Sequence, residues 1–188
     1  MPTAAGVWRD LTVDQNIDFI AASQGIAGTT LKERRAELLE GAGLTDARGR
    51  LAGALSGGMR QKLAFSLAML HRPELVILDE PSTGVDPVSR VDLWRMISQA
   101  AADGAAIVMS TTYLDEADRA AHVTVLDAGE PLLTGTPAEV LASVPGHVTI
   151  DDQQGDRGLS WRRGHRYHHW HRHDPAAGVA RVADMEDA

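Results

Sequence analysis

The sequence predicts an α/β fold with a parallel sheet, preceded by a small helical subdomain. Short continuous apolar runs alternate with amphipathic helical patterns after residue 55, which is typical of strands joined by crossover helices. Residues 1–54 have helical patterns only. The chain has 188 residues, of which 44% are hydrophobic and 4% aromatic, so we expect one domain of ordinary size with an aliphatic core.

Composition excludes several classes of protein. The formal net charge of −8 argues against a nucleic-acid-binding surface. The absence of cysteine excludes a disulfide scaffold and a cysteine-ligated metal site. No apolar run approaches the roughly 18–20 residues that cross a bilayer, and the N-terminus lacks the pattern of a signal peptide. We therefore expect a cytoplasmic chain that binds no nucleic acid.

Two amphipathic helices are expected in the first fifty-four residues. Residues 10–26 have helical apolar spacing, with Thr12 as N-cap and Gln15 completing a capping box. Residues 29–44 form the second, with Thr30 at its start.

The remaining elements follow from apolar periodicity and from proline and glycine positions. The expected order is a helix from Ser56 that stops before Pro73, a strand at 74–80, a helix at 87–104, a strand at 105–112, a short helix at 113–121, a strand at 122–129 and a last helix at 135–144. The continuous apolar run at 74–80 predicts a strand buried on both faces. Beyond residue 145 we expect a linker or tail with one short strand at 147–151.

The stretch "LSGG" begins the third helix. Ser56 can cap the helix through its hydroxyl, while Gly57 and Gly58 leave backbone N–H groups unobstructed at the positive end of the helix dipole. Such an end suits a phosphate, although an ordinary glycine-containing N-cap has the same appearance.

The stretch "LVILDEP" places two acids at the end of a strand. Open α/β sheets bind ligands at the carboxyl ends of their strands. Asp79 can hold Mg²⁺ there, and Glu80 can orient or deprotonate an attacking water. Two solvated acids after a strand are the alternative explanation.

Together, at this spacing, the two motifs resemble the signature and Walker B motifs of ATP-binding cassette (ABC) proteins. "STGVDP", with Asp86, resembles the D-loop of the family, and the segment after it is also similar. Residues 1–145 carry the resemblance, which is greatest to cassettes of exporter-type bacterial transporters, where Met59 is familiar. It implies ATP and Mg²⁺ as cofactors, a transmembrane permease and a second cassette as partners, and a position at the inner face of the cell membrane.

Three departures from the family pattern bear on activity. The P-loop, G-x-x-x-x-G-K-[ST], does not occur, and neither of the two lysines, Lys32 and Lys62, follows a glycine. Thr3 stands where the family usually has the Gln that links Mg²⁺ to the membrane subunit. Thr112 stands where the family has a switch His.

The resemblance and its departures lead to a specific expectation. Residues 1–54 begin the helical subdomain, 55–145 hold the signature helix and half of the ATPase core, and 146–188 are a His/Arg-rich linker or tail. Ser56, Gly57, Gly58 and Asp86 would act on ATP held by a partner, and the chain alone would be inactive. A catalytically inactive half-cassette and a truncated frame without function remain alternatives. A soluble DNA-repair or translation factor is disfavoured, since residues 11–55 leave no room for the long insertions of those relatives.

The histidine-rich stretch "HRYHHWHRH" leaves three interpretations open. His165, His168 and His169 have spacings that could ligate Zn²⁺ or Ni²⁺ if the segment were helical. The interleaved arginines suit a phosphate or an acidic surface instead: Arg162, Arg163, Arg166 and Arg172. A solvated linker is the third interpretation.

Overall fold

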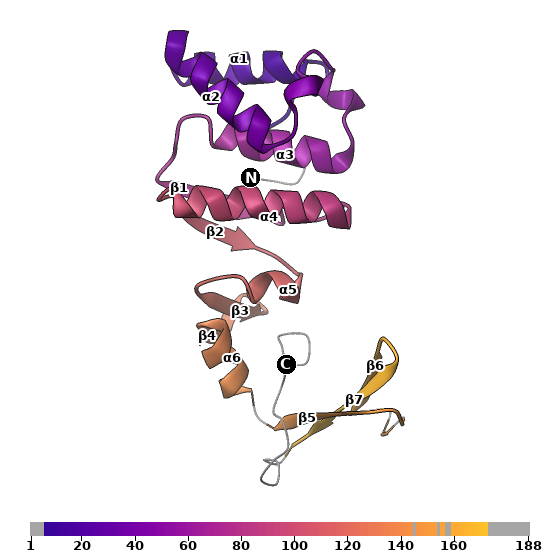
Figure 1. The fold of residues 1–188 in the computed structure, drawn as a ribbon. Helices are drawn as coiled ribbons and strands as arrows, with labels where there is room; N and C mark the ends of the chain where they lie inside the picture. Colours follow the sequence, from indigo (N-terminus) through magenta and orange to yellow (C-terminus); the bar gives the residue numbers. More distant parts are fainter. Residues whose placement is uncertain (1–5, 145, 154, 157–158, 173–188) are drawn as a thin grey trace. The chain divides into compact units, whose positions relative to one another are not determined.

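The structure, a computed structural model, describes residues 6–144, 146–153, 155–156 and 159–172. The chain forms two compact units, Met1–Thr112 and Tyr113–Ala188 (Figure 1). The division between the two units lies after Thr112. The expected boundaries after residues 54 and 145 stay predictions. The helical subdomain and the first two strands have separate buried cores, and the helix at 57–68 joins them because it contributes Leu63 to the first core and Phe65 to the second.

The first unit begins with helices. These are α1 (Val13–Ser23), α2 (Gly28–Gly41), the short 3₁₀ helices η1 (Thr45–Ala47) and η2 (Ala52–Ala54), and α3 (Gly57–Ala68). Thr12 caps α1 in a capping box with Gln15, as the sequence predicts. No helix among the described residues is both long enough and apolar enough to cross a membrane.

Helices α1, α2 and α3 enclose an aliphatic core. Its fully buried side chains include Val13, Ile17, Leu39, Leu44 and Leu63. Every residue of α3 from Gln61 to Leu67 is buried, so α3 is the central helix of this layer.

A parallel strand pair follows α3. Strand β1 (Leu75–Asp79) leads through a turn to α4 (Pro87–Ala102), which returns the chain to β2 (Ala106–Ser110). The two strands pair in parallel, with Leu75 opposite Ala106 and Asp79 opposite Ser110. This is the crossover unit that alternating strands and helices predict.

Only one face of β1 is buried, so the expectation of burial on both faces is wrong for this unit. Val76 and Leu78 pack against Phe65, Leu93 and Ile97 of α3 and α4. On the opposite face Leu75 is 54% exposed and Ile77 61% exposed, and Val108 of β2 is 57% exposed. No described residue of this unit covers that face, although its side chains are as apolar as those of the core.

The uncovered face leads to a prediction about association. The 188-residue chain expressed alone should sediment at micromolar concentration as species heavier than the 20.1 kDa monomer. Ile77→Thr together with Val108→Thr should shift it toward the monomer, because threonine keeps the β preference and removes apolar area. Val91→Thr, at an exposed position of α4, is the control and should not shift the chain toward the monomer. A monodisperse wild-type monomer with a cooperative melt would contradict the prediction.

The second unit starts with a short helix and a hairpin. Helix α5 (Leu114–Ala117) precedes β3 (Val123–Asp127) and β4 (Glu130–Gly135), which pair antiparallel. Strand β4 is not among the elements that the sequence predicts. Ala128 and Gly129 both have positive φ, as a tight two-residue hairpin turn requires. Helix α6 (Pro137–Ser143) follows behind a capping box of Thr136 and Glu139.

Residues 147–171 form a sheet, where we expected a linker with one strand. Strands β5 (His147–Asp151), β7 (Arg166–His171) and β6 (Ser160–Arg163) pair antiparallel in the order β5-β7-β6. The strand at 147–151 is as predicted. The other two read SWRR and RYHHWH and have no regular alternation of polar and apolar residues, so their sequences do not predict strands.

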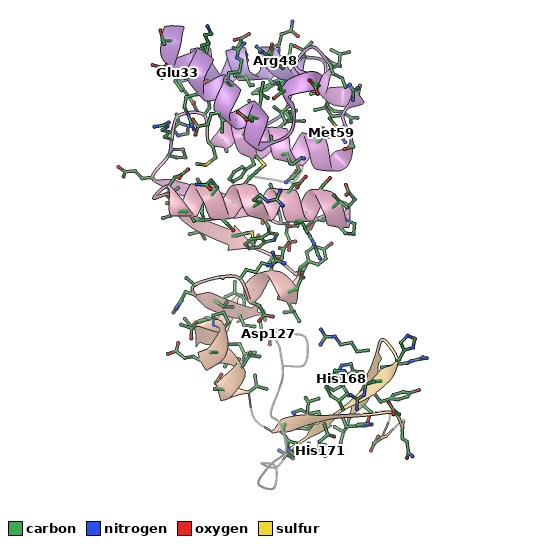
Figure 2. The ribbon with its side chains drawn as sticks, in the orientation of Figure 1. Glu33, Arg48, Met59, Asp127, His168 and His171 are labelled. Carbon is green, nitrogen blue, oxygen red and sulfur yellow. The ribbon has the colours of Figure 1, made fainter. Side chains whose placement is uncertain are left out.

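A metal site in the histidine-rich stretch required that the segment be helical, and this expectation is wrong because residues 166–171 form a strand. His168, labelled in Figure 2, and His169 are consecutive residues of β7, so their side chains point to opposite faces. The His169 Nδ1 atom instead lies 2.7 Å from the Ser160 hydroxyl. Within the described ranges, no group of three or more His, Cys, Asp or Glu residues could hold a metal ion.

Candidate functional site

The first turn of α3 presents backbone N–H groups. Ser56 is the N-cap, and its hydroxyl accepts a hydrogen bond from the Met59 N–H at 3.2 Å. Backbone N–H groups in the first turn of a helix have no partner within the helix. Ser56 and Gly57 are exposed, so the beginning of α3 faces solvent with no Cβ on Gly57.

Gly58 allows α3 and α4 to approach closely. A Cβ added at Gly58 would lie 2.2 Å from both the Cβ and the Oγ of Ser89, and 3.1 Å from Asp86 Oδ2. A Cβ at Gly57 would lie 3.4 Å from the Gly84 carbonyl oxygen. The fold therefore brings the signature glycines against the loop that holds Asp86.

Asp86 has a structural task in this arrangement. Its carboxylate caps α4 by accepting the Ser89 N–H at 2.9 Å. That hydrogen bond lowers the pKa of Asp86 below its usual range. The charged carboxylate thus lies at the positive end of α4 and beside the first turn of α3.

The contact at Gly58 gives a prediction on stability. Gly58→Ala should lower the free energy of unfolding by about 1–3 kcal/mol, because the new methyl group overlaps Ser89. Ser89→Gly removes the obstructing side chain, so the double variant should be more stable than the sum of the single changes implies. Urea denaturation of the four chains measures this coupling.

The matched control is Gly41→Ala, the last residue of α2. A Cβ there meets nothing within 4 Å, so this change should be neutral or slightly stabilising. Strictly additive effects of Gly58→Ala and Ser89→Gly would show that the close approach does not limit stability.

The two acids at the end of β1, Asp79 and Glu80, share a serine from β2. Ser110 Oγ donates to Asp79 Oδ1 at 2.6 Å and accepts the Glu80 N–H at 3.0 Å. Ser110 is a site residue that is not among those predicted from the sequence. Its position in "MSTT", at the carboxyl end of the neighbouring predicted strand, is the signal that could have identified it.

Glu80 is held in an unusual conformation. Its φ is +46°, in the left-handed region that a residue with a side chain occupies at a cost of order 1 kcal/mol. Its Oε2 atom accepts hydrogen bonds from Thr83 at 2.8 Å and from Thr112 at 3.4 Å. Thr112, which replaces the expected switch His, therefore contacts the carboxylate proposed to act on water. Thr3 lies outside the described residues.

The carboxylates at the end of β1 suit a hard cation better than a phosphate without a metal ion. Asp79 and Glu80 offer carboxylate oxygens, the ligands that Mg²⁺ prefers. Neither lysine sits in a glycine-rich loop. Lys62 is ion-paired with Asp92 at 3.1 Å, and Lys32 lies exposed on α2.

Comparisons with known proteins agree on one family. A family model described as "ABC transporter" matches residues 1–83. The chain is 39% identical over 164 residues to the "Probable multidrug ABC transporter ATP-binding protein YbhF" of Escherichia coli, covering 86% of this chain and 28% of that protein. It is 37% identical over 188 residues to the "Daunorubicin/doxorubicin resistance ATP-binding protein DrrA" of Streptomyces peucetius, covering 96% of this chain and 56% of the relative.

A solved "ATP binding subunit of ABC transporter" superposes with a TM-score of 0.63 at 28% identity, over 71% of this chain and 56% of that chain. The chain belongs to the ATP-binding subunit family of ABC transporters. A second solved structure, cbiO1 from Clostridium perfringens, has a TM-score of 0.66 at 23% identity, over 75% of this chain and 57% of that one, and supports the fold alone.

This ABC chain spans only 28–56% of the length of the two relatives named above. The predicted α/β fold of the ABC cassette is confirmed. The structure groups the predicted site residues into two sets, one at the first turns of α3 and α4 and one at the end of β1. Their roles toward ATP stay predictions.

Proposed function

We propose that this chain is the ATP-binding component of an ABC exporter for drug-like compounds. The family supports the ATP and Mg²⁺ requirement, and the names of the relatives, which refer to multidrug transport and to daunorubicin and doxorubicin resistance, support the substrate class. A transmembrane permease would be its partner at the inner face of the cell membrane, with the chain itself on the cytoplasmic side.

We propose further that its contribution to ATP chemistry is made in trans. The observation that carries this is the first turn of α3, where Ser56 caps the helix and the exposed Gly57, which has no Cβ, leaves the approach to the N–H groups open. A phosphate held by a second cassette can reach these donors, and the helix dipole favours its charge.

The acids at the end of β1 belong to a site of the chain's own. Asp79 is the residue that would hold Mg²⁺, and Glu80 would orient or deprotonate water, since Thr83 and Thr112 fix its carboxylate. Bound Mg²⁺ would supply neutralisation of phosphate charge. With no P-loop lysine in the sequence, this site is proposed to be inactive in the chain alone.

The experiment is the steady-state ATPase rate of the cassette that co-purifies with this chain, measured with and without added chain. The rate should rise on addition. A truncated frame without function predicts no change, whereas a purely structural role predicts complex formation without a rise in rate.

A further inference from the structure

A buried arginine holds the far end of the signature helix. Arg34 of α2 is only 7% exposed. Its Nε donates to the Leu70 carbonyl at 3.3 Å and its Nη2 to the Met69 carbonyl at 2.6 Å. Met69 is the C-cap of α3, so the guanidinium satisfies the carbonyl groups that the end of a helix leaves unpaired. A cation at this negative end of the dipole is also favourable.

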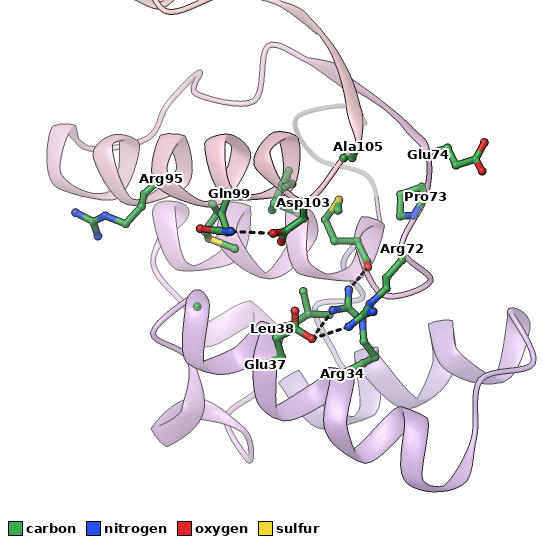
Figure 3. A pocket seen from close by; sticks show the side chains of 16 residues that line it. Arg34, Glu37, Leu38, Arg72, Pro73, Glu74, Arg95, Gln99, Asp103 and Ala105 are labelled. Carbon is green, nitrogen blue, oxygen red and sulfur yellow. Dashed lines mark hydrogen bonds and ion pairs between the residues drawn. The ribbon is translucent and has the colours of Figure 1, made fainter.

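An ion-pair network surrounds this contact (Figure 3). Arg34 Nη1 lies 2.5 Å from Glu37 Oε2, and Arg72 Nη2 lies 3.4 Å from the same oxygen. The hydrogen bond from Arg34 lowers the pKa of Glu37. These side chains help to line an open pocket of about 780 Å³, yet Arg34 itself is buried. Arg34 is therefore the member of the network that packing holds in place.

The network lies at the junction between the two elements that carry the site. Arg72 has a φ of +51°, so the chain reverses there, between the end of α3 and the start of β1 at Leu75. Helix α3 has the signature residues at its other end, and β1 has Asp79 at its other end.

Helix α3 can transmit a displacement along its length. Its 12 residues rise about 1.5 Å each, or roughly 18 Å in total, and its middle is buried throughout. At its first turn Gly58 has no free space against Ser89. A shift at the carboxyl end therefore has to move the signature turn or separate it from α4.

We propose that Arg34 is a positioning residue that sets the place of the signature turn by anchoring the opposite end of α3. The consequence for phosphate contact rests on the trans function proposed above. The mechanical coupling along α3 does not need nucleotide and can be measured without it.

The test is hydrogen–deuterium exchange of the whole chain, comparing residues 57–60 with residues 69–75 and with α1. Within 57–60 the signal comes from the Met59 and Arg60 N–H groups, which are hydrogen-bonded to Ser56. Arg34→Gln should raise exchange at 57–60 at least about fivefold, as well as at 69–75, while α1 keeps its protection. Arg34→Lys keeps the charge but cannot bond both carbonyls in a fork, so it should give a smaller rise at the same two places.

The matched control is Arg35→Gln. Arg35 is the next residue of α2, but it pairs with Asp14 and Asp18 of α1. Its loss should affect α1 and leave 57–60 unchanged. An equal rise at 57–60 in both glutamine variants would overturn the proposal, as would a rise confined to 69–75. If Arg34→Gln does not fold, the comparison uses Arg34→Lys instead. An exchange rate at 57–60 in Arg34→Lys equal to that of the wild-type chain would then overturn the proposal.

The ATPase of the co-purifying cassette separates this inference from the proposed function. If wild-type chain gives no stimulation but Arg34→Gln still loosens 57–60, the trans function fails and the positioning role stands. If wild-type chain stimulates the ATPase of that cassette and folded Arg34→Gln chain stimulates it to the same extent, the positioning role is refuted.

Discussion

Chain carrying Ser56→Arg should fail to stimulate the ATPase of the co-purifying cassette that the wild-type chain stimulates. Ser56 begins the exposed first turn of α3, and an arginine side chain there would occupy the place of the phosphate. The added positive charge would not repel a phosphate, so the expected effect is steric. We expect the stimulation to fall at least about tenfold, as when a donor to a developing charge is lost.

Three further variants test whether the loss of stimulation in Ser56→Arg is specific to that position and to its added bulk. Ser56→Ala removes the cap, at a cost of about 1 kcal/mol, without adding bulk, so it should retain part of the stimulation. Ser98→Arg makes the same change at an exposed position of α4 and should be neutral. Glu80→Gln should matter less than Ser56→Arg, because Glu80 belongs to the site of the chain's own. The trans function would be refuted if Glu80→Gln abolished the stimulation of the ATPase and Ser56→Arg left it intact.

The purified chain by itself should bind Mg²⁺-ATP with a Kd above about 1 mM and should not hydrolyse it. A Kd of 1 mM corresponds to a binding free energy of about −4 kcal/mol. A P-loop supplies backbone N–H groups and one lysine to the phosphates, and the sequence has no such loop. Lys62 cannot substitute without leaving Asp92, with which it forms a mostly buried ion pair. The acids at the end of β1 would repel a phosphate that no metal ion neutralises.

Titration calorimetry with and without Mg²⁺ measures this affinity. Asp79→Asn and Glu80→Gln are the companion variants, and with Mg²⁺ present both should leave the weak binding nearly unchanged. Micromolar affinity, accompanied by turnover that Glu80→Gln abolishes, would show that the chain holds a complete nucleotide site.

Local signals in the sequence determined where several helices begin. The Thr12 capping box and the Ser56 cap are contacts across three residues, and the structure has both. The short apolar runs, bounded by Pro73 and by Gly104, likewise located β1 and β2. The "LSGG" and "LDEP" motifs indicated the ABC family, which the comparisons confirm.

Contacts between distant residues were decided only by the tertiary structure. The Ser110 bond to Asp79 joins residues 31 apart, and the Arg34 bond to Met69 joins residues 35 apart, so no local pattern announces either. Burial of a single face of β1 depends on which elements pack there, and an apolar run looks the same in both cases. The strands β6 and β7 become evident only through their pairing, since hydrogen bonds between strands, and not the polar residues themselves, define that sheet.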